Sequence, residues 1–264
     1  MTENTIRALS GLLYIGLILG SIYAGEIYFT GLILLFTLLV LWEYCRLIRS
    51  SPYLPIFTYT AIVLGFYCYP QLKHFKDGMI LSALGSALIL TGFLLRGQNL
   101  PKNIIRLFTW TYIMGGSLGI ISLYGAHQSP TFLVVLTFGT IWANNTFAYL
   151  FGKSLGKNPL APKVSPKKSW EGFFGGTIMA VLFSMIYSWI SHEMPFEQGV
   201  FFGVGVAILA TLGDLVQSQI KRQVQVKDSG SLLPGHGGFF DRMDSIIFTA
   251  PFITGIHIIY FYVS

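Results

Sequence analysis

Residues 197–222 read EQGVFFGVGVAILATLGDLVQSQIKR, an apolar run that begins with Glu197, contains one carboxylate in its interior, Asp214, and ends in two cations. The run is long enough to cross the hydrocarbon core of a bilayer, which takes roughly 20 apolar residues. A carboxylate inside such a helix is costly and usually marks a functional site. The stretch therefore predicts a membrane-spanning helix that carries chemistry near one end.

The rest of the chain repeats this apolar pattern. Of its 264 residues, 53% are hydrophobic and only 11% are charged, whereas a soluble domain carries about a quarter charged residues. This composition excludes a soluble globular protein and predicts an all-α, polytopic integral membrane protein with about nine transmembrane helices. The expected spans lie near 7–24, 27–45, 54–70, 78–95, 105–124, 130–151, 171–190, 197–220 and 245–263.

The basic residues indicate the orientation of these spans, because cytoplasmic loops carry an excess of Lys and Arg. If the spans alternate in direction, all 17 basic residues except Lys73 and Lys76 fall on one side. We therefore expect a cytoplasmic N-terminus and a C-terminus outside. The basic residues are spread between apolar stretches, so the net charge of +6 indicates topology and contact with anionic lipid, and no nucleic-acid partner.

Two long gaps organise the second half of the chain. They cover about 152–170 and 221–244, both on the predicted cytoplasmic side, and loops of this length are usually functional. We divide the chain into N-terminal membrane helices, 1–125, and a C-terminal catalytic region, 126–264, that contains both loops. Four glycine pairs have the spacing of closely packed helices and predict packing inside one subunit: Gly16/Gly20, Gly115/Gly119, Gly172/Gly176 and Gly199/Gly203.

The aspartates are concentrated near the C-terminus. Of five in the chain, four fall within 31 positions: Asp214, Asp228, Asp241 and Asp244. On a helix, Asp214 shares one stripe with the residues 3, 4, 7 and 8 positions further on, namely Gln217, Ser218, Lys221 and Arg222. Asp241 and Asp244 are also three positions apart, at the entrance to the last span.

Two interpretations of these carboxylates remain open. They are solvated loop charges that pair with Lys221, Arg222 or Arg242, or two carboxylate-bearing helices meet at one cation. Oxygen donors favour a hard ion such as Mg²⁺, which takes one or two carboxylates and leaves its other positions to phosphate and water. The second interpretation predicts a phosphate–metal site at the cytoplasmic face.

The two loops contain further candidates for anion binding. Residues 230–238 are rich in glycine, Gly237 included, and let backbone N–H groups approach an anion, although a flexible linker has the same composition. His236 is either a phosphate contact or a structural residue. In the earlier loop, Ser165 followed by Pro166 suits the N-cap and first position of a helix, and the lysines that follow would favour an anion there. Positive-inside signalling also explains those lysines.

The loop residues resemble a known family. The match covers roughly 142–245, while the first five spans match only in hydropathy and number. The segments that carry the resemblance are 160–163, 165–172, 221–222, 227–230, 233–238 and 241–245. These segments resemble the signature of the phosphatidate cytidylyltransferases, or CDP-diacylglycerol synthases. The chain length is similar to that of compact bacterial members.

The resemblance implies a reaction in which CTP and phosphatidate give CDP-diacylglycerol and pyrophosphate. It also implies a homodimer in the bacterial cytoplasmic (inner) membrane, with the active site facing the cytoplasm. It favours Mg²⁺ as the cofactor and leaves a second cation open. On this basis the metal carboxylates are Asp214 and Asp241, with support from Asp244 and Asp228. The phosphates would be held by Lys167, Lys168, Lys221, Arg222, Lys227 and Arg242. Polar contacts would come from Ser165, Ser218, His236 and Gly237.

Two positions depart from the family pattern. Asn145 stands where the family usually has Asp, and Gln217 stands where it has an acidic residue. Each change keeps the shape of the side chain and removes its charge. We hypothesise that the substrate pocket persists and that activity is lowered.

Three alternatives therefore stay open. The chain could be a catalytically silent homologue that binds CTP and lipid, or a CTP-dependent enzyme that acts on another lipid phosphate. A cation-coupled transporter is the third, although carboxylates and lysines gathered on one side argue against it.

Overall fold

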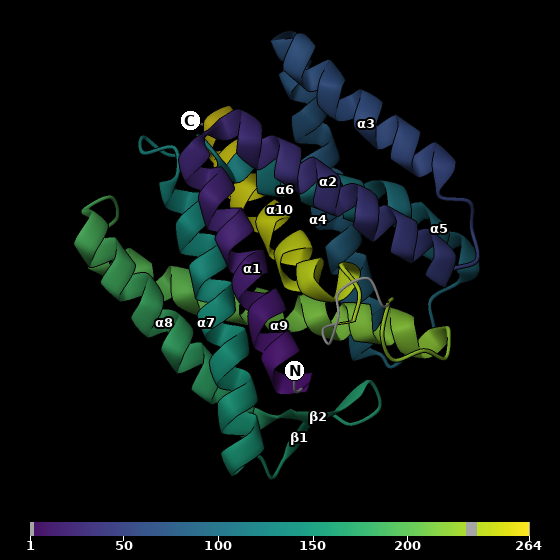
Figure 1. Ribbon diagram of the computed structural model, residues 1–264, viewed down its shortest axis with the longest axis vertical. Coiled ribbons are helices and arrows are strands. Elements are labelled where there is room, and N and C mark those ends of the chain that lie inside the picture. The colour runs from purple at the N-terminus through teal and green to yellow at the C-terminus, as the bar shows by residue number, and fades with distance from the viewer. Residues whose placement is uncertain (1–2, 231–236, 264) are drawn as a thin grey trace.

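The computed structural model describes residues 3–230 and 237–263, and this part of the chain is almost wholly helical (Figure 1). The expected all-α class is confirmed. The helices are α1 (Glu3–Ala24), α2 (Glu26–Leu47), α3 (Tyr53–Cys68), η1 (Pro70–Leu72), α4 (Lys73–Leu95), α5 (Lys102–Phe108), η2 (Thr109–Met114), α6 (Gly115–Leu123), α7 (Phe132–Leu155), α8 (Trp170–Ser191), α9 (Phe196–Gln223) and α10 (Phe240–Val263). Strands β1 (Pro159–Ala161) and β2 (Ser165–Ser169) form an antiparallel hairpin between α7 and α8.

Each expected span coincides with helical structure. The span near 105–124 consists of α5, a π-helical turn and α6 in direct succession. Within the described residues, six helical stretches are long and apolar enough to cross a membrane, and two shorter apolar helices cover 9–24 and 53–68. The chain is a multi-pass membrane protein, and the count of nine spans stays a prediction.

Closely packed helices hold the second half of the chain together. α8 packs against both α7 and α9. A β-carbon at Gly176 would lie 2.7 Å from a backbone oxygen of α7, and one at Gly203 would lie 2.6 Å from the α8 backbone. The predicted packing role is confirmed for Gly115/Gly119, Gly172/Gly176 and Gly199/Gly203, as small residues let helix backbones approach, and it is wrong for Gly16/Gly20. Gly16 and Gly20, by contrast, have nothing within 4 Å of such a β-carbon.

α10 joins the two halves of the chain. It packs against α4 and α6 from the first half and against α9 from the second. A β-carbon at Gly213 of α9 would lie 2.9 Å from the backbone oxygen of Asp244, so the first turns of α10 press against the part of α9 that carries Asp214. The division of the chain at residue 125 stays a prediction.

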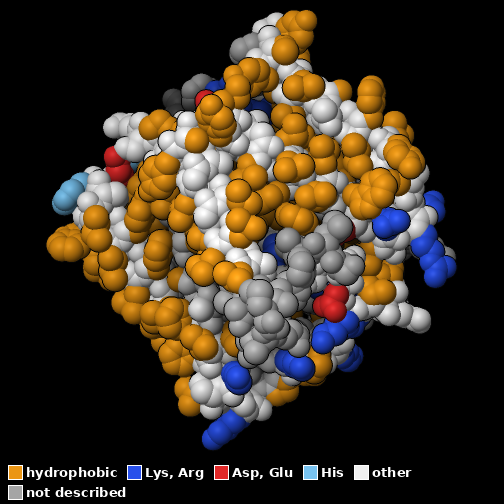
Figure 2. Space-filling model, in the orientation of Figure 1, with side chains coloured by type: hydrophobic (Ala, Val, Ile, Leu, Met, Phe, Trp, Pro, Cys, Tyr) orange, Lys and Arg blue, Asp and Glu red, His pale blue; other side chains and the backbone are white. Residues whose placement is uncertain are grey.

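The surface is apolar over much of its area. Figure 2 shows hydrophobic side chains across most of the visible face, with most of the visible Lys and Arg along its lower and right margins. Large side chains such as Phe57, Leu64, Phe201 and Ile256 are exposed. Lipid would cover such a surface, because soluble proteins rarely expose large contiguous apolar areas.

Candidate active site

The hairpin before α8 differs from the expected helix start. Residues 165–169 form strand β2, which pairs with 159–161, so the prediction that Ser165 caps a helix beginning at Pro166 is wrong. Pairing between the strands satisfies these backbone groups instead. α8 begins directly after Ser169, whose hydroxyl accepts a hydrogen bond at 3.1 Å from the backbone N–H three residues on. The N-cap is therefore four residues later than expected.

Strand β2 brings one lysine to α9. The Lys168 Nζ lies 2.6 Å from Asp214 Oδ2. Asp214 Oδ1 accepts a hydrogen bond from the Ser218 hydroxyl, one turn further along α9, at 3.2 Å. The neighbouring Lys167 is exposed. The structure thus brings together Lys168, Asp214 and Ser218, and leaves Lys167 apart.

The Asp241 carboxylate, in the first turn of α10, is bonded through both oxygens. Its Oδ1 lies 2.6 Å from Lys221 Nζ and 3.1 Å from Gln217 Nε2. Its Oδ2 accepts hydrogen bonds from Ser229 N at 2.9 Å, the Ser229 hydroxyl at 3.0 Å and Gly238 N at 3.1 Å. Asp241 therefore ties α9 to the chain on both sides of residues 231–236, and its role as a metal ligand stays a prediction.

Gln217 has a use that the sequence comparison did not suggest. The side chain is fully buried, and its amide donates a hydrogen bond to Asp241. An ionised Glu has no donor, and its charge would repel Asp241 at this distance. The Gln217 amide can therefore lie next to the Asp241 carboxylate without repulsion. The acidic residue that the family has at this position could do so only with a cation between the two carboxylates.

Asp244 lies one turn deeper on α10 and is buried. It interacts electrostatically with Asp214, Lys168 and Lys221, so the two ion pairs and this third carboxylate form one charged cluster. Asn145 approaches the cluster from α7, where its Nδ2 donates to the Ser245 hydroxyl at 3.3 Å. The second departure from the family pattern thus also lies at this site.

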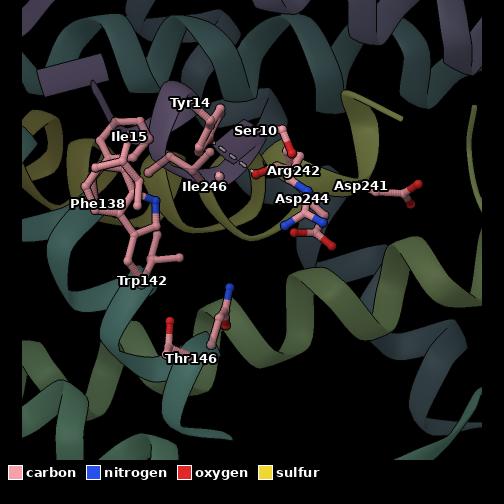
Figure 3. A pocket seen from close by; sticks show the side chains of 13 residues that line it. Ser10, Tyr14, Ile15, Phe138, Trp142, Thr146, Asp241, Arg242, Asp244 and Ile246 are labelled. Carbon is pink, nitrogen blue, oxygen red and sulfur yellow. Dashed lines mark hydrogen bonds between the residues drawn. The ribbon is translucent and has the colours of Figure 1, made fainter. Parts of the chain in front are cut away.

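A pocket of about 200 Å³ opens beside the cluster, between α1, α7 and α10 (Figure 3). Phe138 and Trp142 lie at one end, Arg242 and Asp244 lie at the other, and Tyr14 lies between the two groups (Figure 3). The Tyr14 hydroxyl donates to the backbone oxygen of Arg242 at 3.4 Å. A cavity of about 440 Å³ at the ends of α2, α5 and α9 has no carboxylate among its lining residues. The smaller pocket therefore has an apolar surface that suits the chains of an ionic lipid and a charged surface that suits its head group.

The remaining predicted residues of α9 and its following loop lie farther out. Arg222 donates to the backbone oxygens of Val164 at 3.3 Å and Val226 at 3.1 Å, so it holds the hairpin and the loop. Lys227 and Asp228 are exposed. Their contacts with substrate stay predictions.

Two features of the structure favour glycine at position 237. Its φ of 79° is left-handed, and a β-carbon would lie 2.9 Å from Asp241 Oδ2. His236 lies outside the described residues, and its predicted phosphate contact is untested.

Glu43 of α2 is a site residue that the sequence analysis missed. It is buried, and its Oε2 accepts hydrogen bonds from Phe240 N at 2.9 Å and the Ser229 hydroxyl at 3.2 Å. The available signal was a carboxylate inside an otherwise apolar span, near 27–45. Its distance in sequence from the other acidic residues concealed the connection.

The donor set fits a magnesium ion that takes most of its ligands from phosphate and water. Among the described residues no group of three or more His, Cys, Asp or Glu is arranged to hold a metal ion without other ligands. Mg²⁺ takes one or two carboxylates at nucleotide sites, and Asp214 and Asp244 are two carboxylates that interact electrostatically in this cluster. A cation between them would balance their mutual repulsion.

Comparison with known proteins defines the class of the chain. Residues 5–261 match the cytidylyltransferase family, and the chain belongs to that family. It is 30% identical over 266 residues to a phosphatidate cytidylyltransferase of Bacillus subtilis, covering 96% of this chain and 97% of the relative. It is 28% identical over 285 residues to a phosphatidate cytidylyltransferase of Haemophilus influenzae, covering 97% of each. An uncharacterized protein of Escherichia coli, YnbB, is 35% identical over 232 residues, 82% of this chain and 74% of its own length.

Proposed function

We propose that the chain transfers a cytidylyl group from CTP to phosphatidate, giving CDP-diacylglycerol and pyrophosphate. The observation that carries this proposal is the charged cluster of Lys168, Asp214, Lys221 and Asp244 beside a pocket with an aromatic end, in a chain of the cytidylyltransferase family. Such a site can hold a triphosphate and a lipid phosphate next to each other. The apolar part of a lipid acceptor would contact the aromatic side chains of the pocket.

The transfer depends on correct positioning of the two substrates and on neutralisation of their phosphate charges more than on acid–base chemistry. A phosphate oxygen of phosphatidate attacks the α-phosphorus of CTP, and the bond from that phosphorus to the oxygen bridging to the β-phosphate breaks, so pyrophosphate leaves. The attacking phosphate is largely ionised at neutral pH, because its second pKa is near 6. Lys168 is partly exposed and can shift from Asp214 to a phosphate, while Arg242 faces the pocket.

The proposal includes Mg²⁺. Asp214 and Asp244 would hold it, with the Asn145 amide close by, whereas both oxygens of Asp241 already have protein partners. Bound there, the ion would neutralise charge on the triphosphate and the leaving pyrophosphate. The two carboxylates would hold the positive charge of the ion next to the pocket and would take no part in bond making or breaking.

The proposed setting is the bacterial inner membrane, with the site at its cytoplasmic face. The positive-inside distribution of Lys and Arg supports that orientation, and the relatives described above are bacterial. The lipid chains would enter sideways between helices while CTP enters from the cytoplasm. A homodimer, implied by the family resemblance, is also part of the proposal.

Position-specific labels of CTP test the reaction. Purified protein in detergent micelles is given phosphatidate, Mg²⁺ and CTP labelled at either the α- or the γ-phosphorus. The proposal predicts α-label in the lipid and γ-label in pyrophosphate, both abolished by chelation of Mg²⁺. Label from the γ-phosphorus in the lipid would instead identify a CTP-dependent lipid kinase and overturn the proposal.

The same preparation tests the silent homologue that Asn145 and Gln217 suggest. Calorimetry measures CTP binding with and without Mg²⁺. Binding without product would identify a pocket that binds CTP and does not turn it over, and it would also overturn the proposed transfer.

A further inference from the structure

Glu43 connects the first half of the chain to the start of α10. Phe240 is the first residue of α10, and its backbone N–H is bonded to the Glu43 carboxylate, 197 residues away in sequence. The first N–H groups of a helix have no partner inside the helix, and a negative charge is favourable there. Glu43 therefore caps α10 from a different part of the chain.

The same carboxylate occupies the space beside two glycines of the glycine-rich loop. A β-carbon at Gly230 would lie 2.6 Å from Glu43 Oε1 and 3.0 Å from its Cδ. A β-carbon at Gly238 would collide with Glu43 Oε2 and with the Ser229 hydroxyl. Gly230 and Gly238 lie on either side of residues 231–236 in the sequence, so one buried side chain packs against the chain both before and after that segment.

Glu43 is joined to Asp241 through shared partners. The Ser229 hydroxyl lies 3.2 Å from Glu43 Oε2 and 3.0 Å from Asp241 Oδ2. Gly238, which packs on Glu43, donates its N–H to Asp241. Asp241 in turn holds Lys221 of α9 at 2.6 Å. A displacement of Glu43 would therefore reach Lys221 in the charged cluster through two hydrogen-bonded residues.

We infer that Glu43 is a positioning residue for the transfer: it fixes Ser229, Gly238 and the first turn of α10, and thereby fixes Asp241 and Lys221. The inference rests on the proposed function and assigns part of the site to α2. It also gives a reason for glycine at position 230 that backbone conformation does not, because Gly230 has no left-handed φ.

Paired substitutions test the inference. Gly230→Ala should lower kcat by about tenfold, because its methyl group displaces the Glu43 carboxylate, and Glu43→Ala should lower kcat similarly by removing the cap. The double variant should lose no more kcat than Glu43→Ala alone, because the methyl group introduced at position 230 then occupies the space that the Glu43 carboxylate has left. Glu43→Gln should retain most of the activity, because its amide oxygen still accepts both hydrogen bonds.

Matched controls separate this coupling from general damage. Glu26→Ala removes an exposed carboxylate at the other end of α2, and Gly92→Ala adds a methyl group where nothing lies within 4 Å. Both should leave kcat and the KM for CTP unchanged. Multiplicative losses in the double variant, or a fully active Glu43→Ala, would overturn the inference while the wild-type reaction still stood.

Hydrogen exchange gives a readout that does not need turnover. In Glu43→Ala, the backbone N–H groups of Ser229, Gly238 and Phe240 should exchange at least about tenfold faster, while α7 keeps its wild-type rates. Unchanged exchange at these three positions would overturn the inference. If the wild type makes no CDP-lipid, the proposed function fails, and this exchange measurement still decides whether Glu43 positions the loop.

Discussion

Two lysine–aspartate pairs of equal length lie at the two sides of the candidate site, and they differ in almost everything else. Lys168–Asp214 and Lys221–Asp241 both measure 2.6 Å. The side chains of the first pair are 27% and 33% exposed, and those of the second only 11% and 13%. The first pair joins a surface hairpin to α9, whereas the second joins α9 to α10 inside the protein.

The Asp241 carboxylate, which is the less exposed of the two, also accepts more hydrogen bonds than the Asp214 carboxylate. Beyond its lysine, Asp214 accepts one hydrogen bond from the described residues, while Asp241 accepts four. A carboxylate with few partners can exchange a lysine for a phosphate-bound cation at low cost, and a saturated carboxylate cannot. From this difference we propose that Asp214 and Lys168 bind substrate, whereas Asp241 and Lys221 hold α9 and α10 together.

Asp241→Asn should have the largest effect and should act on stability. It removes the carboxylate that is hydrogen-bonded to the buried Lys221 ammonium, and breaking a buried ion pair in this way typically costs about 3–5 kcal/mol. Asp214→Asn should cost at most about 1 kcal/mol, because its partner reaches water. Thermal unfolding of both variants in detergent micelles measures the difference, and equal losses would contradict the distinction between the pairs.

Asp214→Asn should have the next largest effect, on catalysis. Loss of the carboxylate should lower kcat by about 100-fold, the usual cost of removing one group that stabilises transition-state charge. Glu197→Gln is the matched control, because it neutralises an exposed carboxylate in the first turn of the same helix. The measurement is CDP-lipid formation at saturating CTP and Mg²⁺. A normal kcat in Asp214→Asn would assign the chemistry elsewhere.

Restoring the family's acids adds negative charge to both sides of the site. The double substitution Asn145→Asp and Gln217→Glu should raise CTP-dependent activity by about tenfold, through tighter binding of Mg²⁺. Without Mg²⁺ the same protein should unfold at a lower temperature than wild type, because position 217 then places a second carboxylate 3.1 Å from Asp241. An unchanged rate would reject the hypothesis that the two amides impair turnover.

Local periodicity explains which parts of this site could be predicted. Helical spacing is enough to place Ser218 one turn from Asp214, and the hydrogen bond between them is present. Apolar runs likewise mark the spans to within a few residues. These features depend on neighbours in the sequence, so no knowledge of tertiary structure is needed.

The features that were missed depend on contacts between distant segments. Ser165 has the local character of an N-cap, but pairing with residues 159–161 makes it part of a strand. Glu43 meets Phe240 across 197 residues. Gln217 looks like a lost charge until Asp241 is placed beside it. In each case a tertiary partner decides the role of a side chain whose own sequence context is ambiguous.

The smallest predicted effect separates two neighbouring lysines. Both were expected to hold phosphate, but Lys168 pairs with Asp214, whereas Lys167 is exposed. Lys168→Gln should raise the KM for CTP by about fivefold, which corresponds to one charge-assisted contact at a partly exposed site. Lys167→Gln has the same change in charge and should raise it less than about twofold. Steady-state titration of CTP measures both values. If Lys167→Gln has the larger effect, Lys167 is the lysine that contacts CTP, and Asp214 then keeps its lysine during the reaction.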